Sequence, residues 1–106
     1  MTYEYTVKLH HSDGEKAIDS MKKAVILHHA RCFYDGCGKF LIKDPELPNS
    51  WSYDISVESQ SQELYLSIVG WSDNLYRIFK SALKDIRYVI VDDDDEEISL
   101  EKVFRK

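Results

Sequence analysis

The chain lacks the segments that mark membrane and secreted proteins. Its longest uninterrupted apolar run covers residues 24–27, whereas a helix that crosses a bilayer needs roughly 18 apolar residues. The N-terminal residues contain no basic segment followed by an apolar block, which is the pattern of a secretory signal peptide. We therefore predict a cytoplasmic protein that makes no contact with a membrane.

Cysteine and glycine are also scarce, with two and four residues. A small secreted domain held by disulfides has more cysteines at regular spacing, so Cys32 and Cys37 are expected to be reduced thiols in or near the core. A small loop disulfide or a metal site is the alternative for this pair. Gly36 and Gly38 belong to one turn, which leaves few positions for a phosphate-binding loop. The motifs GxSxG, HExxH and paired CxxC are absent. We therefore expect no enzyme activity, no cofactor and no metal centre.

What the chain does contain is typical of a globular protein. It has 106 residues, of which 43% are hydrophobic and 31% are charged. A chain of this length buries enough surface to fold without a metal or a disulfide. We predict a single domain over residues 1–106, because no linker divides the sequence.

Period-two alternation of apolar and polar residues predicts the strands. A half-buried strand is expected over residues 2–10, and a hairpin is expected from residues 53–58 and 64–69. Residues 40–42 are interpreted as a short edge strand. Residues 88–91 are apolar on both faces, which is typical of a covered central strand.

Apolar residues at three- and four-residue spacing predict two helices. The first runs from about Asp13 to about Ala30 with Ser12 as its cap, and the second follows Ser72. Residues 98–104 fit either a strand or a helical turn. The order β-α-β-β-β-α-β plus a C-terminal segment predicts an α+β fold, a two-layer sandwich with a mostly antiparallel sheet and both helices on one face. This layout resembles ferredoxin-like and barstar-like proteins, whose functions are diverse.

Negative charge is concentrated in one short segment. Residues 92–101 hold seven acidic residues and no basic one, whereas the rest of the chain holds 12 acidic and 14 basic residues, a balance of +2. The segment does not fit a calcium loop, because Glu97 occupies the position where that loop has glycine. Such acids can steer a basic partner or guard a sheet edge. The predicted partner-binding residues are Asp92, Asp93, Asp94, Asp95, Glu96 and Glu97.

Three aromatic residues outside the predicted apolar faces extend this site. Tyrosine and tryptophan carry much of the binding energy at protein interfaces, because they bury a large area with little loss of rotamer freedom. Packing against a second covered face of the sheet would explain Tyr65 and Trp71 equally well. We include Trp71, Tyr65 and Trp51 in the predicted partner-binding site.

An alternative to a partner-binding protein is a small cytosolic enzyme or metal-binding protein that uses His28, Cys32 and Cys37. His28 and Cys32 are four residues apart on the predicted first helix, a spacing that can chelate zinc. The pattern offers three ligands and no fourth. Direct nucleic-acid binding is not expected, because the acidic segment would repel phosphates from the basic stripe of the second helix, formed by Arg77, Lys80, Lys84 and Arg87.

Two stretches in the second half of the chain resemble a known class of protein. Residues 70–79 (GWSDNLYRIF) and residues 88–91 (YVIV), which run into DDDDEE, are similar to the small acidic immunity proteins of bacterial toxin systems, in particular the contact-dependent growth-inhibition type. The resemblance implies a cytoplasmic inhibitor that binds one cognate toxin, often a nuclease, and blocks its substrate cleft. The leading hypothesis is a non-catalytic inhibitor of a basic toxin domain. A phage-type inhibitor that mimics nucleic acid is a further alternative.

Overall fold

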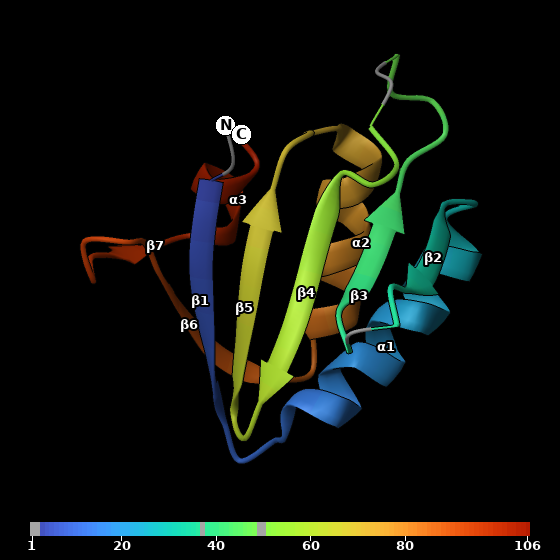
Figure 1. Ribbon diagram of the computed structural model, residues 1–106. Coiled ribbons are helices and arrows are strands. Elements are labelled where there is room, and N and C mark those ends of the chain that lie inside the picture. The colour runs from blue at the N-terminus through green and yellow to red at the C-terminus, as the bar shows by residue number, and fades with distance from the viewer. Residues whose placement is uncertain (1–2, 37, 49–50) are drawn as a thin grey trace.

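The computed structural model describes residues 3–36, 38–48 and 51–106. This part of the chain forms one seven-stranded sheet with helices packed on one of its faces (Figure 1). In chain order the elements are β1 (Tyr3–His10), α1 (Gly14–Leu27), β2 (Arg31–Tyr34), β3 (Phe40–Lys43), β4 (Ile55–Gln60), β5 (Glu63–Ile68), α2 (Asp73–Leu83), β6 (Arg87–Val91), β7 (Glu97–Ile98) and α3 (Leu100–Val103).

The strands follow the order β2-β3-β4-β5-β1-β6-β7, and every neighbouring pair is antiparallel. Alternation along each strand assigns its two faces. On β1, Val7 and Leu9 are buried against the helices, whereas Glu4 and Lys8 are exposed on the other side. The predicted hairpin corresponds to β4 and β5. The predicted fold class is confirmed: an α+β two-layer sandwich with an antiparallel sheet and α1 and α2 on one face.

The core lies between the sheet and the two long helices. Both helices carry apolar residues at helical spacing, and burial of each such side chain contributes about 1.5–3 kcal/mol. The Ser72 hydroxyl accepts a hydrogen bond from the Leu75 amide at 3.0 Å, as predicted for the cap of the second helix. The most buried helical residues include Ile18, Met21, Val25, Leu75, Ile78 and Phe79.

A buried polar cluster connects the sheet to the start of α2. The fully buried Asp54 carboxylate accepts hydrogen bonds from Lys43 Nζ at 3.2 Å and from the Asp44 amide at 2.8 Å. Asp44 in turn accepts from the Ser72 hydroxyl at 2.7 Å. A Cβ added to Gly70 would lie 2.6 Å from an Asp54 carboxylate oxygen, so this position requires glycine. The cluster therefore fixes where α2 begins relative to β3 and β4.

The first helix is shorter than predicted. Asp13 rather than Ser12 is its cap, since the Asp13 carboxylate accepts from the amide three residues ahead at 2.8 Å. The helix ends at Leu27, and His29 adopts a left-handed backbone conformation with φ of 59°. His29 and Cys32 continue the helical spacing in the sequence, but His29 lies in the turn after the helix, and Cys32 belongs to β2, which gains a ladder of backbone hydrogen bonds with β3.

Two strand predictions need correction. Residues 40–42 belong to β3, which is interior rather than at an edge, because β2 pairs with its outer side. Residues 88–91 belong to β6, which lies next to the edge rather than in the centre, because the two-residue β7 covers it. The C-terminal residues 98–104 combine both alternatives, the end of β7 and the helix α3. Among the helices described, none is long and apolar enough to cross a membrane.

Candidate functional site

The sheet face that turns away from the helices contains a hollow of about 280 Å³. Short side chains on neighbouring strands form its floor. Ser56 on β4 pairs with Ser67 on β5, and in the adjacent row Thr6 on β1 pairs with Tyr65 on β5. Serine and threonine leave a depression in the middle of the sheet that longer side chains would fill, and Tyr65, which is 38% exposed, borders it.

Four carboxylates and one lysine line this space, which we call the acidic hollow. Glu4 comes from β1, Glu58 from β4, and Asp92 and Asp93 follow β6, while Lys39 precedes β3. The register explains their convergence, because Glu4 lies opposite Ser67 and Glu58 lies opposite Tyr65. The formal charge of the lining is −3 with these five residues ionised. Charges of one sign in a concave site focus the field, so the acidic hollow favours a cationic group.

The turn between β6 and β7 holds the acidic segment in a defined shape. One Asp92 carboxylate oxygen accepts hydrogen bonds from the backbone N–H groups of Asp94 at 2.9 Å and Glu96 at 3.0 Å. The Asp92 N–H donates to the Glu96 carbonyl at 3.0 Å, and Asp95 completes the turn with a left-handed φ of 59°. Asp92 therefore organises the turn, as aspartate does in Asx-turns.

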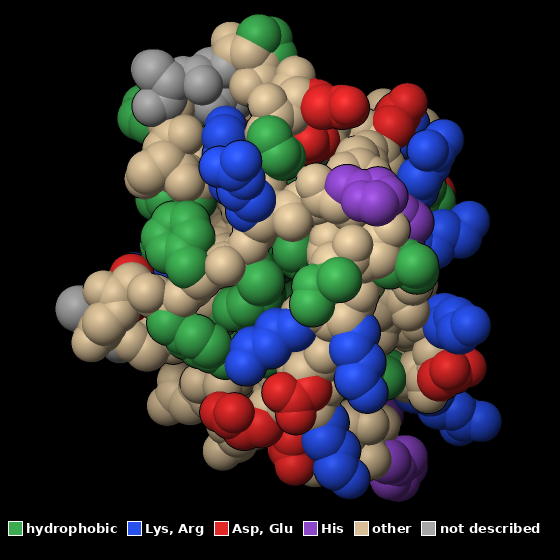
Figure 2. All heavy atoms as spheres, turned by 90° about the vertical axis from the view of Figure 1, so that its right-hand side faces the viewer, with side chains coloured by type: hydrophobic (Ala, Val, Ile, Leu, Met, Phe, Trp, Pro, Cys, Tyr) green, Lys and Arg blue, Asp and Glu red, His purple; other side chains and the backbone are tan. Residues whose placement is uncertain are grey.

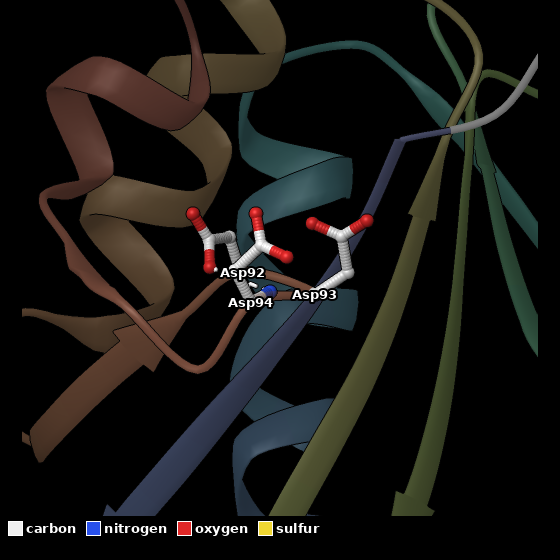
Figure 3. A group of neighbouring side chains, drawn as sticks. All are labelled: Asp92, Asp93 and Asp94. Carbon is white, nitrogen blue, oxygen red and sulfur yellow. Dashed lines mark hydrogen bonds between the residues drawn. The ribbon is translucent and has the colours of Figure 1, made fainter.

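The first three acids of the turn lie close together. The carboxylates of Asp92, Asp93 and Asp94 point to the same side of the turn (Figure 3), and one oxygen of each lies within 4.8 Å of the others. Calcium takes six to eight oxygen ligands, whereas this group holds six carboxylate oxygens, and one of them, on Asp92, already accepts two backbone hydrogen bonds. We interpret it as a concentrated source of negative charge beside the acidic hollow.

Two tyrosines experience the charge of this region. Burial raises the pKa of Tyr5, and the carboxylates of Asp92 and Asp93 raise it further, against the opposing effect of Arg105. Partial desolvation also raises the pKa of Tyr65, and the nearby carboxylates of its own sheet face add to this effect. Both phenols therefore remain neutral near pH 7, and the Tyr65 hydroxyl donates to a Glu63 carboxylate oxygen at 3.4 Å.

The structure brings three of the predicted partner-binding residues together in the acidic hollow, namely Asp92, Asp93 and Tyr65. The rest of the acidic segment is exposed along the turn and the start of β7. Trp51 is 57% exposed in the loop between β3 and β4, outside the lining of the hollow. The exposed acidic residues outside the lining are Asp94, Asp95, Glu96 and Glu97.

Trp71 is half-buried beside the core. Its indole N–H donates to the Val103 carbonyl at 2.8 Å, its ring meets the Tyr3 ring edge-on at 5.0 Å, and the Arg105 guanidinium lies 3.9 Å from its ring centre. These contacts attach α3 to the segment before α2. They give Trp71 a structural role, through α3 and its neighbours rather than through the second covered sheet face that the sequence left open as an alternative.

The runner-up metal site does not assemble as predicted. His28 follows the end of α1 whereas Cys32 lies on β2, so the predicted i, i+4 pairing on one helix is wrong. Burial raises the pKa of the Cys32 thiol, which lowers the fraction of thiolate available to bind a metal or attack a substrate. Cys37 lies outside the described residues. Among residues 3–36, 38–48 and 51–106, the one group of three His, Cys, Asp or Glu side chains close enough to share a metal ion consists of the three aspartates at the start of the β6–β7 turn.

Sequence reasoning missed three residues of the acidic hollow, Glu4, Glu58 and Lys39. Glu4 and Glu58 occupy the polar side of alternating strands, which is a detectable signal. Their convergence depends on which strands are neighbours and in which register, and the alternation pattern contains neither.

The lining of the acidic hollow contains carboxylates, hydroxyls and one ammonium group on a sheet face without helical cover. This chemistry suits the binding of a cationic surface. No protein-family model matches the chain, and no curated protein matches it.

Proposed function

We propose that this protein is a non-catalytic inhibitor of the immunity type, which binds the basic face of a cognate toxin domain in the cytoplasm through the acidic hollow. The observation that carries the proposal is the convergence of Glu4, Glu58, Asp92 and Asp93 around Tyr65 on the uncovered face of the sheet. An isolated acidic loop would provide charge alone. Here the same charges surround a shaped depression with an aromatic residue at its border.

The size of the acidic hollow favours a protein partner over a small molecule. Pockets for drug-sized ligands usually enclose about 300–1,000 Å³, and a volume of about 280 Å³ lies just below that range. A lysine or arginine that protrudes from a partner could enter it. Tyr65 offers the stacking surface and the hydroxyl that such a cation uses. The exposed acids of the β6–β7 turn would then extend the contact beyond the hollow.

A basic partner is consistent with the inhibitor hypothesis. Enzymes that cut nucleic acid bind phosphates with lysines and arginines. A rigid acidic surface placed over such a cleft would exclude the substrate, because its carboxylates would pair with the lysines and arginines that otherwise bind the phosphates. Asp92 gives the turn this rigidity through two backbone hydrogen bonds, so little conformational entropy is lost on binding.

Affinity capture from the native host with immobilised protein tests the proposal. The wild-type protein is compared with the variant Glu4→Gln/Glu58→Gln/Asp93→Asn, which removes three charges from the acidic hollow and retains the Asp92 turn. We expect the wild type to retain a basic protein that elutes with salt, and the variant to lose it. When the captured protein is then expressed in cells, its toxicity should be relieved by the wild type and not by the variant.

The matched control removes three charges elsewhere. Asp19→Asn/Glu46→Gln/Asp85→Asn has the same net charge, and these three residues are exposed outside the hollow. The control should capture the same protein as the wild type. Equal capture by the hollow variant, or capture of partners without a basic surface and without toxicity, would contradict the proposed function.

A further inference from the structure

The two edges of the sheet differ in their protection. β7 is two residues long, and its first residue, Glu97, is the last of six consecutive acidic residues. Short, charged edges discourage pairing with another strand. β2, at the opposite edge, is four residues long, and its sequence RCFY contains one charged residue, Arg31. Phe33 and Tyr34 on this strand are 43% and 49% exposed. The β2 edge therefore has the features of a pairing edge.

Exposed hydrophobic side chains are concentrated near β2. The described residues include seven large hydrophobic side chains that are exposed, and four of them belong to the end of α1 and to β2. Figure 2 looks onto the side of the molecule where α1 and β2 lie, and it shows hydrophobic side chains between lysines and arginines. The four residues are Ile26, Leu27, Phe33 and Tyr34.

The backbone of β2 presents hydrogen-bonding groups at this edge. The Asp35 N–H donates to the Lys39 carbonyl at 3.1 Å, while the Lys39 N–H donates to the Asp35 carboxylate at 3.1 Å, so Asp35 stands at a hydrogen-bonding position of the β2–β3 hairpin. Bonded and non-bonded pairs alternate along an antiparallel ladder. The odd-numbered residues of β2 therefore bond to β3, and the N–H and C=O groups of Cys32 and Tyr34 point away from it, toward the edge.

We propose that β2 pairs antiparallel with β2 of a second copy of this chain and continues the sheet across a two-fold axis. The symmetry places one residue opposite its own copy, and the two registers that pair three residues of β2 with the second copy centre on Cys32 or on Phe33. Centring on Phe33 pairs Cys32 with Tyr34 of the second copy through four backbone hydrogen bonds. Centring on Cys32 would use the Ala30 N–H, which already donates to the Val25 carbonyl at 3.0 Å.

The side chains support the register centred on Phe33. The two Phe33 rings face each other as a non-bonded pair, with Cβ atoms about 4.5–5.5 Å apart. Arg31 lies opposite Asp35 of the second copy, so both ends of the interface bring opposite charges together. Head-on contact of two Arg31 side chains, which a parallel pairing would produce, is avoided. The acidic hollow lies mostly on β1, β4, β5 and the end of β6, and Lys39, before β3, is its one lining residue near the β2 edge, so most of the hollow stays accessible in the dimer.

Sedimentation velocity from micromolar to millimolar concentration tests the proposal. We expect the wild type to form a dimer, Phe33→Lys to weaken the association at least tenfold, and Tyr65→Lys to leave it unchanged. Tyr65 is the matched control, because it is an exposed aromatic residue on the same sheet face but belongs to the acidic hollow. Tyr65→Lys should impair binding of the basic partner and leave the dimer intact, whereas Phe33→Lys should weaken the dimer and leave partner binding intact. The two variants therefore separate this proposal from the proposed function.

A cross-linking experiment tests the register without a charge change. In a Cys32→Ser/Cys37→Ser background, Phe33→Cys should oxidise to a covalent dimer, whereas Tyr34→Cys should not. A wild-type protein that stays monomeric at all concentrations would overturn the proposal. So would equal cross-linking of both cysteine variants, or a monomer whose β2 binds an extended segment of a different protein.

Discussion

Replacement of Asp54 by alanine should destabilise the protein more than any substitution of an exposed acid. The carboxylate is fully buried and accepts from Lys43 Nζ and from the Asp44 amide. Removing it leaves the buried amide without this acceptor, which costs about 1–3 kcal/mol. It also removes the ion-pair contact to the Lys43 ammonium group, whose side chain is 16% exposed, and breaking a buried ion pair costs about 3–5 kcal/mol. Because Lys43 can turn toward water, we expect a total of about 3 kcal/mol.

Urea denaturation followed by circular dichroism measures this loss. Asp54→Asn keeps an oxygen for the Asp44 amide and should lie between the wild type and Asp54→Ala. Asp19→Ala is the control, because the Asp19 side chain is 72% exposed and its contact with Lys22 is 4.0 Å long, so it should change the unfolding free energy by less than about 0.5 kcal/mol. A loss below about 1 kcal/mol for Asp54→Ala, at an unchanged m-value, would refute the role of the buried cluster.

Three further predictions concern the fold and the acidic turn. Gly70→Ala should lower the unfolding free energy by about 1–3 kcal/mol in the same assay, because its Cβ would lie 2.6 Å from an Asp54 oxygen. Asp92→Ala should increase amide hydrogen exchange in the β6–β7 turn, whereas Asp92→Asn, which keeps an acceptor oxygen, should not; equal exchange in both variants would contradict the turn's assigned hydrogen bonds. Stability measured against pH should fall as the pH rises past about 10, the ordinary tyrosine pKa, because folding raises the pKa of three tyrosines and the unfolded chain loses those protons first. A flat alkaline profile would contradict the raised pKa values of Tyr5, Tyr65 and Tyr88.

The periodic elements of the fold could be predicted from the sequence, because local physics specifies them. Alternation identifies β1, β4 and β5, and helical spacing with the Ser72 cap identifies α2. The end of α1 could not be located in this way. His29 and Cys32 fit the helical period, but His29 has a left-handed φ of 59° after the helix ends, and Cys32 pairs with Ile42 in the β2–β3 hairpin. Because the sequence pattern does not indicate β2, it places β3 at an edge.

The candidate site shows the same division. The acidic segment, from Asp92 onward, is visible in the sequence as an anomaly of charge, and Tyr65 as an aromatic residue on a polar face. Glu4 and Glu58 are 54 positions apart and meet because β5 lies between their strands. Trp71 looked equally suited to a partner, and its hydrogen bond to Val103 depends on the packing of α3.

The central claim is that the charges of the acidic hollow bind a basic partner. The most direct test is the association rate with the captured partner, measured against ionic strength for the wild type, the Glu4→Gln/Glu58→Gln/Asp93→Asn variant and the control variant of equal net charge. We predict that at low salt the hollow variant associates at least about tenfold more slowly, that the control changes less than about threefold, and that the difference shrinks as the Debye length falls toward about 8 Å. Equal rates for the hollow variant and the control at every salt concentration would contradict the claim.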